Sequence, residues 1–250
     1  PMKKLRFNIT IREILKVSRP FSWINTAAPY AIGYLLATGQ TDLGFWIGTL
    51  YFLFPYNLAM YGINDIYDYE SDIKNPRKDS IEGSVLSKKK HPALWIAIIA
   101  CNLPFIAYFL LASPNIASGL GFVVLAFLCV SYSMKGLRFK EIPILDSINS
   151  ACHFVGPFVF ALLFGSSTNF HWPVIISFML WGVASQAFGA IQDIIPDRAG
   201  SIRSIATWMG AKRTARFALV YYSLSALVIL LAYWPLGFLP ALLLGIYSLN

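Results

Sequence analysis

Long apolar stretches separated by short polar connections limit the folds open to this chain more than any other feature. Eight stretches are expected to form spans, because an α-helix of roughly 20 apolar residues crosses the hydrocarbon core of a bilayer. They cover residues 21–39, 44–64, 92–112, 115–133, 144–165, 172–192, 214–233 and 236–249. Only 13% of the 250 residues are charged, against roughly 25% in soluble domains. The sequence therefore predicts one all-α domain over residues 1–250, a polytopic transmembrane helical bundle.

The positive charges distinguish the two sides of this bundle. All 20 lysine and arginine residues lie within 3–19, 74–90, 135–140 and 198–216. The alternate connections, near 40–43, 113–114, 166–171 and 234–235, contain none. Since Lys and Arg concentrate in cytoplasmic loops, the N-terminal segment 1–19 and the other basic regions are expected in the cytoplasm of a multi-pass cell-membrane protein. The net charge of +8 then needs no nucleic-acid partner, and membrane lipid is the expected partner of the apolar surface.

The two halves of the chain resemble each other in outline. Long connections follow the second and sixth spans, and both begin with acidic residues, after "GIND" at 62–65 and "AIQD" at 190–193. This correspondence predicts two pseudo-repeated four-helix halves around a central cavity. The stretch 236–249 is short for a span, so we expect the C-terminus to be truncated.

A stripe of polar side chains runs down the second span and ends in carboxylates. If residues 57–72 form one helix at 100° per residue, five side chains share an arc of about 80°. They are Asn57, Tyr61, Asp65, Asp68 and Asp72.

The sixth span ends in a similar group. Gln186, Gly189, Asp193 and Asp197 share an arc of about 80° if the helix continues past Pro196. The proline ring opposes that continuation, because it clashes with the preceding turn of a helix.

Carboxylates gathered on one helical face repel one another and favour a cation between them. Mg²⁺ prefers oxygen ligands and commonly combines one or two carboxylates with phosphate oxygens of a substrate. The two acidic groups therefore predict Mg²⁺ ions with a diphosphate between them, and Lys74, Arg77 and Arg203 are candidate phosphate contacts. The alternative is that these residues are ordinary solvated acids at a membrane boundary.

The two motifs together resemble the signatures of the UbiA superfamily of intramembrane prenyltransferases. "NDIYDYESD" at 64–72 is similar to the first signature, and "DIIPD" at 193–197 is similar to the second. The resemblance implies nine helices around a cavity capped on the cytoplasmic side, where Mg²⁺ bridges the acidic motifs to an isoprenyl diphosphate. One family helix is missing from the eight spans visible here.

By the same resemblance, specific residues receive roles. The implied metal ligands are Asn64, Asp65, Asp68, Asp72, Asp193 and Asp197, with the aspartates 68, 72, 193 and 197 also counted as catalytic. Asn64, Lys74, Arg77, Lys135, Arg138 and Arg203 are implied contacts of the donor diphosphate.

Further stretches are similar to the lycopene-elongase branch of this family. They include "SRPFSWINTAAPYAIGYLLATG", "PYNLAMYGINDIYDYESDIKNPRK" and "WGVASQAFGAIQDIIPDR". That branch prenylates the ends of acyclic carotenoids. The resemblance therefore implies transfer from an allylic diphosphate, such as dimethylallyl diphosphate, to lycopene or a related carotenoid in long-chain carotenoid biosynthesis.

Other polar residues within the spans have two interpretations each. Tyr61 could stabilise an allylic cation through its ring face, or serve only in packing. His153 could accept the terminating proton. Asn57, Asn149 and Gln186 could contact substrate, since polar residues at depth usually face an interior cavity. For His153, Asn149 and Gln186, hydrogen bonds between helices are the alternative.

Other functions fit parts of the pattern. A prenyltransferase acting on an aromatic quinone precursor would use the same acidic motifs, but no lysine or arginine lies mid-span to pair with an acceptor carboxylate. A two-repeat transporter would explain repeated halves, yet transporters place their polar sites near the bilayer midplane. A membrane scaffold that binds partners through its acidic loops would not need matched spacing.

Overall fold

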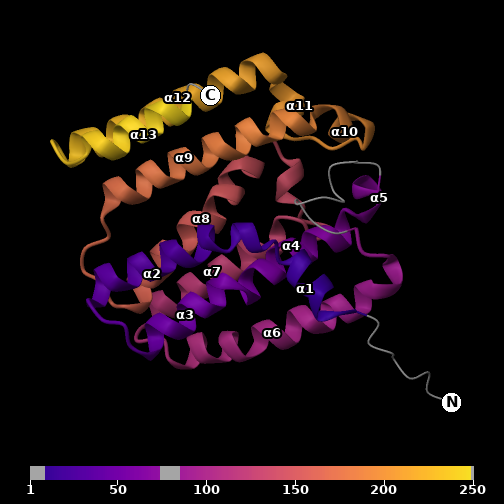
Figure 1. The fold of residues 1–250 in the computed structure, drawn as a ribbon, viewed down its shortest axis with the longest axis horizontal. Helices are drawn as coiled ribbons and strands as arrows, with labels where there is room; N and C mark the ends of the chain where they lie inside the picture. Colours follow the sequence, from indigo (N-terminus) through magenta and orange to yellow (C-terminus); the bar gives the residue numbers. More distant parts are fainter. Residues whose placement is uncertain (1–8, 74–84, 249–250) are drawn as a thin grey trace.

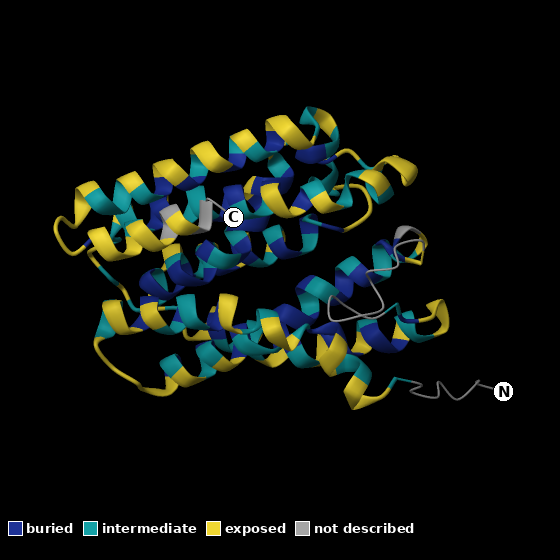
Figure 2. Ribbon diagram, turned by 45° about the horizontal axis from the view of Figure 1, so that its top comes forward, coloured by how far each residue is buried: buried dark blue, intermediate teal, exposed yellow. Residues whose placement is uncertain are grey.

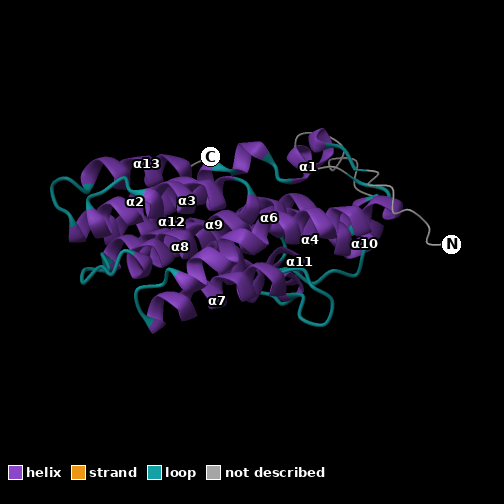
Figure 3. Ribbon diagram, turned by 90° about the horizontal axis from the view of Figure 1, so that it is seen from below, coloured by secondary structure: helices purple, strands orange, loops and turns teal. Residues whose placement is uncertain are grey.

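The computed structural model describes residues 9–73 and 85–248, and every regular element within them is a helix (Figures 1 and 3). The α-helices are α1 (Ile11–Val17), α2 (Ile24–Thr38), α3 (Leu43–Leu53), α4 (Pro55–Tyr67), α5 (Tyr69–Asp72), α6 (His91–Leu111), α7 (Ile116–Ser131), α8 (Leu145–Phe164), α9 (Trp172–Ala190), α10 (Ile194–Ala199), α11 (Ile205–Met209), α12 (Ala211–Ala232) and α13 (Phe238–Ser248). Short 3₁₀ helices are η1 (Pro20–Ser22), η3 (Lys88–Lys90), η4 (Phe139–Glu141) and η5 (Ile191–Asp193).

The expectation of an all-α, membrane-type bundle is confirmed. Each predicted span contains a helix, and within residues 9–73 and 85–248 five helical segments are long and apolar enough to cross a membrane. These are Leu43–Tyr67, Lys88–Leu111, Leu145–Phe164, Trp172–Ala199 and Ala211–Ala232. Ile116–Ser131 is a shorter apolar helix. The count of eight crossings and the repeat of two halves stay predictions.

The outward faces of these helices are apolar. Leu111, Ile116 and Leu231 are each more than 70% exposed, and Figure 2 shows exposed residues along the outer sides of the bundle around a buried centre. Contiguous apolar surface of this kind is unusual on a water-soluble protein. Lipid is the environment that such a surface fits.

Helix α8 lies at the centre, packed against α2, α7 and α9. Small residues permit these close approaches: a Cβ on Gly33 of α2 would lie 2.8 Å from the carbonyl oxygen of Phe158. A Cβ on Gly182 of α9 would lie 2.8 Å from the Cβ of Ala151. Small residues at helix contacts are typical of membrane bundles. Helices α12 and α13 continue the packing outward from α9 (Figure 1).

The second predicted span is broken in the middle. Pro55 lacks a backbone N–H, so α3 ends at Leu53 and α4 begins at Pro55. Asn57 compensates for the lost helical bonds: its Nδ2 donates to the carbonyls of Phe52 at 2.8 Å and Leu53 at 3.1 Å, and to Thr26 Oγ1 at 2.8 Å. Beyond the break, α4 runs toward the end of the bundle where α5, α10 and α11 lie (Figure 1).

Candidate active site

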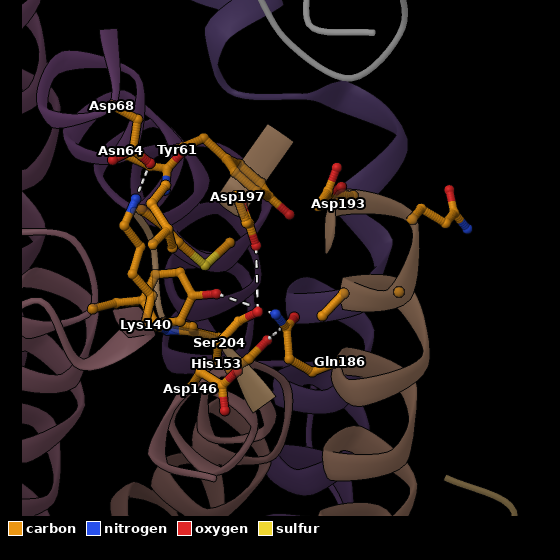
Figure 4. A pocket seen from close by; sticks show the side chains of 18 of the residues that line it. Tyr61, Asn64, Asp68, Lys140, Asp146, His153, Gln186, Asp193, Asp197 and Ser204 are labelled. Atoms are coloured by element: carbon orange, nitrogen blue, oxygen red, sulfur yellow. Dashed lines mark hydrogen bonds and ion pairs between the residues drawn. The ribbon is translucent and has the colours of Figure 1, made fainter. Parts of the chain in front are cut away.

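A cavity of about 600 Å³ lies at this end of the bundle, and both acidic motifs line it. Asp68 and Asp72 come from the first motif, and Asp193 and Asp197 come from the second. Asp68 and Asp193 are 125 positions apart in the sequence. In Figure 4, Asp68, Asp193 and Asp197 gather toward one end of the close-up, while Asp146, His153 and Gln186 lie toward the other. The fold therefore brings the two motifs to one shared opening.

The first motif does not form one uninterrupted helix. Helix α4 ends at Tyr67, Asp68 is its C-cap, and α5 begins at Tyr69. Tyr61, Asn64 and Asp68 line the cavity together with Asp72. Their spacing of three, four and four positions places them on one face.

Two members of the expected polar stripe face elsewhere. Asp65 is 7% exposed and accepts a 3.1 Å hydrogen bond from Arg19 Nη2, and it does not line the cavity. Asn57 is fully buried at the break between α3 and α4. The interpretation of Asn57 as a substrate contact is therefore corrected, since its amide stabilises that break.

The second motif also leaves the straight helix. Helix α9 ends at Ala190, and η5 and α10 follow, with Pro196 in the first turn of α10. Proline is tolerated there, because the first helical N–H groups need no partner within the helix. Asp197 accepts a 3.3 Å hydrogen bond from Ser204 Oγ. Its position is thus fixed by the start of α11 rather than by a continued α9.

Two basic side chains hold Asp68. Lys140 Nζ forms an ion pair with Asp68 Oδ2, and Arg138 Nη2 lies 3.4 Å from Asp68 Oδ1. Arg138 also pairs with Glu141. Burial lowers the pKa of Lys140 to about 8, although nearby carboxylates, Glu141 first among them, oppose that shift. Lys140 lines the cavity and is a cation that the sequence interpretation did not select.

Arg19 is the second cation that the sequence interpretation missed. It lines the cavity, and its guanidinium lies 4.2 Å from the centroid of the Tyr61 ring. Arg19 lies in the connection between α1 and α2, and its ion pair with Asp65 holds its guanidinium in place. The contact with the ring then holds the side chain of Tyr61. Both missed residues end a basic region beside a span. A cation in that position is a reasonable candidate for a site residue. Only the fold of the connecting segments, however, determines which of these cations point into the cavity.

The other predicted basic contacts lie apart from the acidic groups or outside the described residues. Lys135 is exposed and does not line the cavity. Arg203 lines a separate cleft with Arg198 and Trp208. The structure therefore does not bring Lys135 or Arg203 to the acidic opening. Lys74 and Arg77 lie outside the residues that the structure describes.

Polar groups continue into the bundle below the carboxylates. His153 Nδ1 and Tyr56 Oη are 3.0 Å apart, and Ser150 Oγ donates to Gln186 Oε1 at 2.9 Å. Gln186 and His153 both line the cavity, as the sequence predicted for residues at depth. Asn149 does not; its Nδ2 donates to the carbonyl of Leu128 at 3.3 Å, which indicates a helix–helix contact.

Asp146 has a structural task at this site. Its Oδ2 accepts from the backbone N–H of Ile205 at 2.8 Å, and its Oδ1 accepts from the N–H of Ser147 at 2.7 Å. The first bond ties the beginning of α11 to α8 across 59 positions. Because Ser204 lies next to Ile205, this tether also positions the hydroxyl that bonds Asp197.

Comparison with known proteins agrees with the motifs. Residues 26–250 match the model of the UbiA prenyltransferase family. The chain belongs to this family. A C(50) β-cyclic carotenoids biosynthesis protein of Dietzia sp. is 51% identical over 87% of the chain, which spans about half (51%) of that relative's length. The lycopene elongase/hydratase of Corynebacterium glutamicum is 44% identical over 88% of the chain and 77% of its own length.

Solved structures share the fold. A UbiA homologue from Archaeoglobus fulgidus, bound to DMAPP and Mg²⁺, superposes with a TM-score of 0.74 at 20% identity and covers 95% of this chain and 84% of its own. A homologue from Aeropyrum pernix gives a TM-score of 0.71 at 16% identity over 92% of this chain and 86% of its own. The family assignment of the bundle therefore rests on sequence and fold together.

The donor set around the cavity fits a hard divalent cation. Within the described residues, no cluster of three or more His, Cys, Asp or Glu side chains is close enough to hold a metal ion by itself. Mg²⁺ does not require one, because it commonly combines one or two carboxylates with phosphate oxygens and water. Two carboxylates on each motif, around a shared opening, supply that kind of partial ligand set.

Proposed function

We propose that this UbiA-family protein catalyses Mg²⁺-dependent transfer of a prenyl group from an allylic diphosphate to the end of an acyclic carotenoid. Dimethylallyl diphosphate is the proposed donor, and lycopene or a close relative is the proposed acceptor. The observation that carries this proposal is the shared cavity, which joins four carboxylates from two distant motifs to a deeper wall of aromatic and polar side chains. Its volume of about 600 Å³ lies within the usual range of small-molecule sites.

The proposed donor site lies among the carboxylates of Asp68, Asp72, Asp193 and Asp197. When bound there, Mg²⁺ would stabilise negative charge on the diphosphate leaving group. Asn64 would give its side-chain oxygen to the metal or donate a hydrogen bond from its amide to the diphosphate. Asp65 stays among the proposed metal ligands, at a greater distance from the cavity. Arg138 is kept as a proposed cation near the phosphate oxygens, Lys140 and Arg19 are added, and Lys135 and Arg203 are left out. Lys74 and Arg77 stay proposed contacts.

The proposed reaction centre lies deeper in the cavity. Breaking the allylic C–O bond leaves a cation, and Tyr61 would present its ring to that charge. Tyr132 and Phe154 also line the cavity and would help to exclude water, which would otherwise capture the cation. Gln186 would contact the acceptor end or orient Tyr132, since its Nε2 lies 3.4 Å from Tyr132 Oη.

The relatives support the choice of a carotenoid acceptor. Two proteins more than 40% identical to this chain are named for C(50) carotenoid biosynthesis and for lycopene elongation and hydration. The bound DMAPP in the Archaeoglobus fulgidus homologue supports the choice of donor for the fold. We also propose that the acidic opening faces the cytoplasm, because Arg19 and Lys140, which belong to two of the basic regions, line the cavity there.

Co-expression with a lycopene pathway tests the acceptor directly. The expected product, seen by mass spectrometry, is heavier than lycopene by one or two five-carbon units, with or without added water. Purified protein in lipid should release pyrophosphate from dimethylallyl diphosphate only when Mg²⁺ and the carotenoid are present. Unchanged lycopene together with prenylation of an aromatic acid would instead support the quinone-precursor activity.

A further inference from the structure

The deep end of the cavity contains a histidine with one ring nitrogen unused. His153 on α8 is 2% exposed, and it lines the same cavity as the carboxylates. Its Nδ1 is 3.0 Å from Tyr56 Oη. Among the described residues, none offers a hydrogen-bond partner to its Nε2. A buried polar atom without a partner is costly, so this nitrogen is expected to meet a group that enters the cavity.

The surroundings of His153 hold the ring in place. The Tyr132 ring packs edge-on against it, with centroids 5.4 Å apart and planes at 86°. Tyr56 is fully buried on α4 and contacts the opposite part of the ring through its hydroxyl. The imidazole is therefore oriented by two aromatic side chains from α4 and the end of α7, and it is not a mobile side chain.

Its depth separates it from the diphosphate end. Tyr56, the hydrogen-bond partner of His153, lies in the first turn of α4. Asp68, the C-cap of that helix, follows 12 positions later. Twelve residues of α-helix span roughly 18 Å.

The second motif lies nearer to His153, because Asp197 bonds Ser204, whose neighbour Ile205 bonds Asp146. Asp146 precedes His153 by seven positions, roughly 10 Å of helix, on α8. The donor's diphosphate would lie between the motifs, and the carbon that finally carries the positive charge would lie beyond the transferred prenyl unit. A base near the deep end is thus better placed than the departing diphosphate to take a proton.

We infer that His153 Nε2 is the general base that accepts the proton released when prenyl transfer ends. This inference rests on the function proposed above. The acceptor's π electrons form the new C–C bond to the allylic cation and leave a tertiary cation on the acceptor. Nε2 then takes a proton from the neighbouring carbon, and the C–H electron pair becomes the new double bond. The imidazolium later returns its proton to solvent or diphosphate, so one acceptor hydrogen is replaced by one prenyl group.

Tyr56 is the positioning residue in this scheme. For Nε2 to carry a lone pair, the neutral imidazole must bear its hydrogen on Nδ1 and donate it to Tyr56 Oη. The other polar candidates in this part of the cavity are engaged: both oxygens of Asp146 accept backbone hydrogen bonds, and Gln186 bonds Ser150.

The test separates donor chemistry from proton transfer. Wild type, His153→Gln and His153→Ala would be reconstituted in lipid with Mg²⁺, dimethylallyl diphosphate and lycopene. Donor affinity, pyrophosphate release and prenylated product would be measured separately. His171→Asn is the matched control, because His171 precedes α9 away from the cavity, at a φ of 49° that asparagine tolerates.

We expect both His153 variants to bind the donor as wild type does, and to form prenylated product about 100-fold more slowly, a typical general-base contribution. Pyrophosphate release should fall less than product formation, with prenyl alcohol making up the difference. Added imidazole should restore product formation in His153→Ala, more strongly for more basic imidazoles. Tyr56→Phe should give an intermediate loss.

Three results would overturn the inference. They are full product formation by His153→Gln, equal loss of donor binding and product, and no response of His153→Ala to imidazole. Failure of the wild type to release pyrophosphate would instead overturn the proposed function itself, so the two failures are distinguishable.

Discussion

Lys140 and Asp68 form an ion pair across 72 positions of the sequence, and their side chains are only 10% and 7% exposed. The pair joins η4, in the connection before α8, to the end of α4. It therefore places a cation beside a carboxylate that the proposed function assigns to the diphosphate site. A buried pair of this kind costs desolvation energy, and removing one partner is more harmful than removing both.

Substitution of Lys140 should show this asymmetry. Lys140→Met leaves the carboxylate of Asp68 buried beside Arg138, which is 3.4 Å away. We expect the free energy of unfolding to fall by about 3 kcal/mol, or roughly 6–12 °C in melting temperature. The double variant Lys140→Met/Asp68→Asn should melt higher than Lys140→Met. Thermal unfolding in detergent measures both, and strictly additive losses would show that the pair is not coupled.

The carboxylates of the shared cavity are expected to be needed for turnover and not for folding. Asp72→Asn and Asp193→Asn keep the shape of each side chain but remove its charge, so turnover should fall by at least about 100-fold with little change in melting temperature. Glu70→Gln is the matched control: Glu70 lies in the same acidic segment, but its side chain is 75% exposed and pairs with Lys88. Wild-type pyrophosphate release by Asp193→Asn would remove that residue from the site.

The sequence predicts which aspartates come together because the signal is local, while their role at a metal site stays a proposal. Aspartates at fixed spacing after apolar stretches are visible without a structure, and all four of Asp68, Asp72, Asp193 and Asp197 line one cavity. Periodicity could not show what Asn57 does, because Asn57 lies in the first turn of α4, just after the break at Pro55, and its amide bonds the carbonyls of Phe52 and Leu53 on the other side of that break.

The cations of the site could not be chosen in the same way. Lys135 and Lys140 lie in one short basic region, and only the fold of the connection before α8 turns Lys140 toward Asp68 and leaves Lys135 exposed. Arg19 likewise reaches Tyr61 from a backbone with φ of 51°, a conformation that neither composition nor periodicity indicates.

Metal and diphosphate should stabilise the protein together. A ligand that binds only the folded state adds about 2.7 kcal/mol at a concentration 100 times its dissociation constant. We expect pyrophosphate with Mg²⁺ to raise the melting temperature, and each alone to have a much smaller effect, because phosphate oxygens complete the ligand set. EDTA should abolish both the shift and turnover. An equal shift with pyrophosphate in EDTA would show that the basic side chains alone hold the anion.

Two asparagines of α4 provide a final contrast between a structural and a binding residue. Asn57 Nδ2 donates to Thr26, Phe52 and Leu53 at the helix break. Asn64, seven positions later, lines the cavity and donates to Ser133 Oγ at 3.0 Å. Asn57→Ala removes the amide donor from Leu53 and Thr26 and leaves the Phe52 carbonyl with the Thr26 hydroxyl as its side-chain donor. It should therefore reduce the free energy of unfolding by about 1–3 kcal/mol and leave the donor KM unchanged.

Asn64→Ala should do the reverse, raising the donor KM with a small effect on stability, because its amide faces the proposed diphosphate site. Melting curves and donor titrations on both variants, prepared side by side, measure the contrast. An increased donor KM in Asn57→Ala at normal stability would return that residue to the substrate contacts. An unchanged KM in Asn64→Ala would place the diphosphate farther from α4, because a 3.0 Å bond to Ser133 would then be the whole function of the amide.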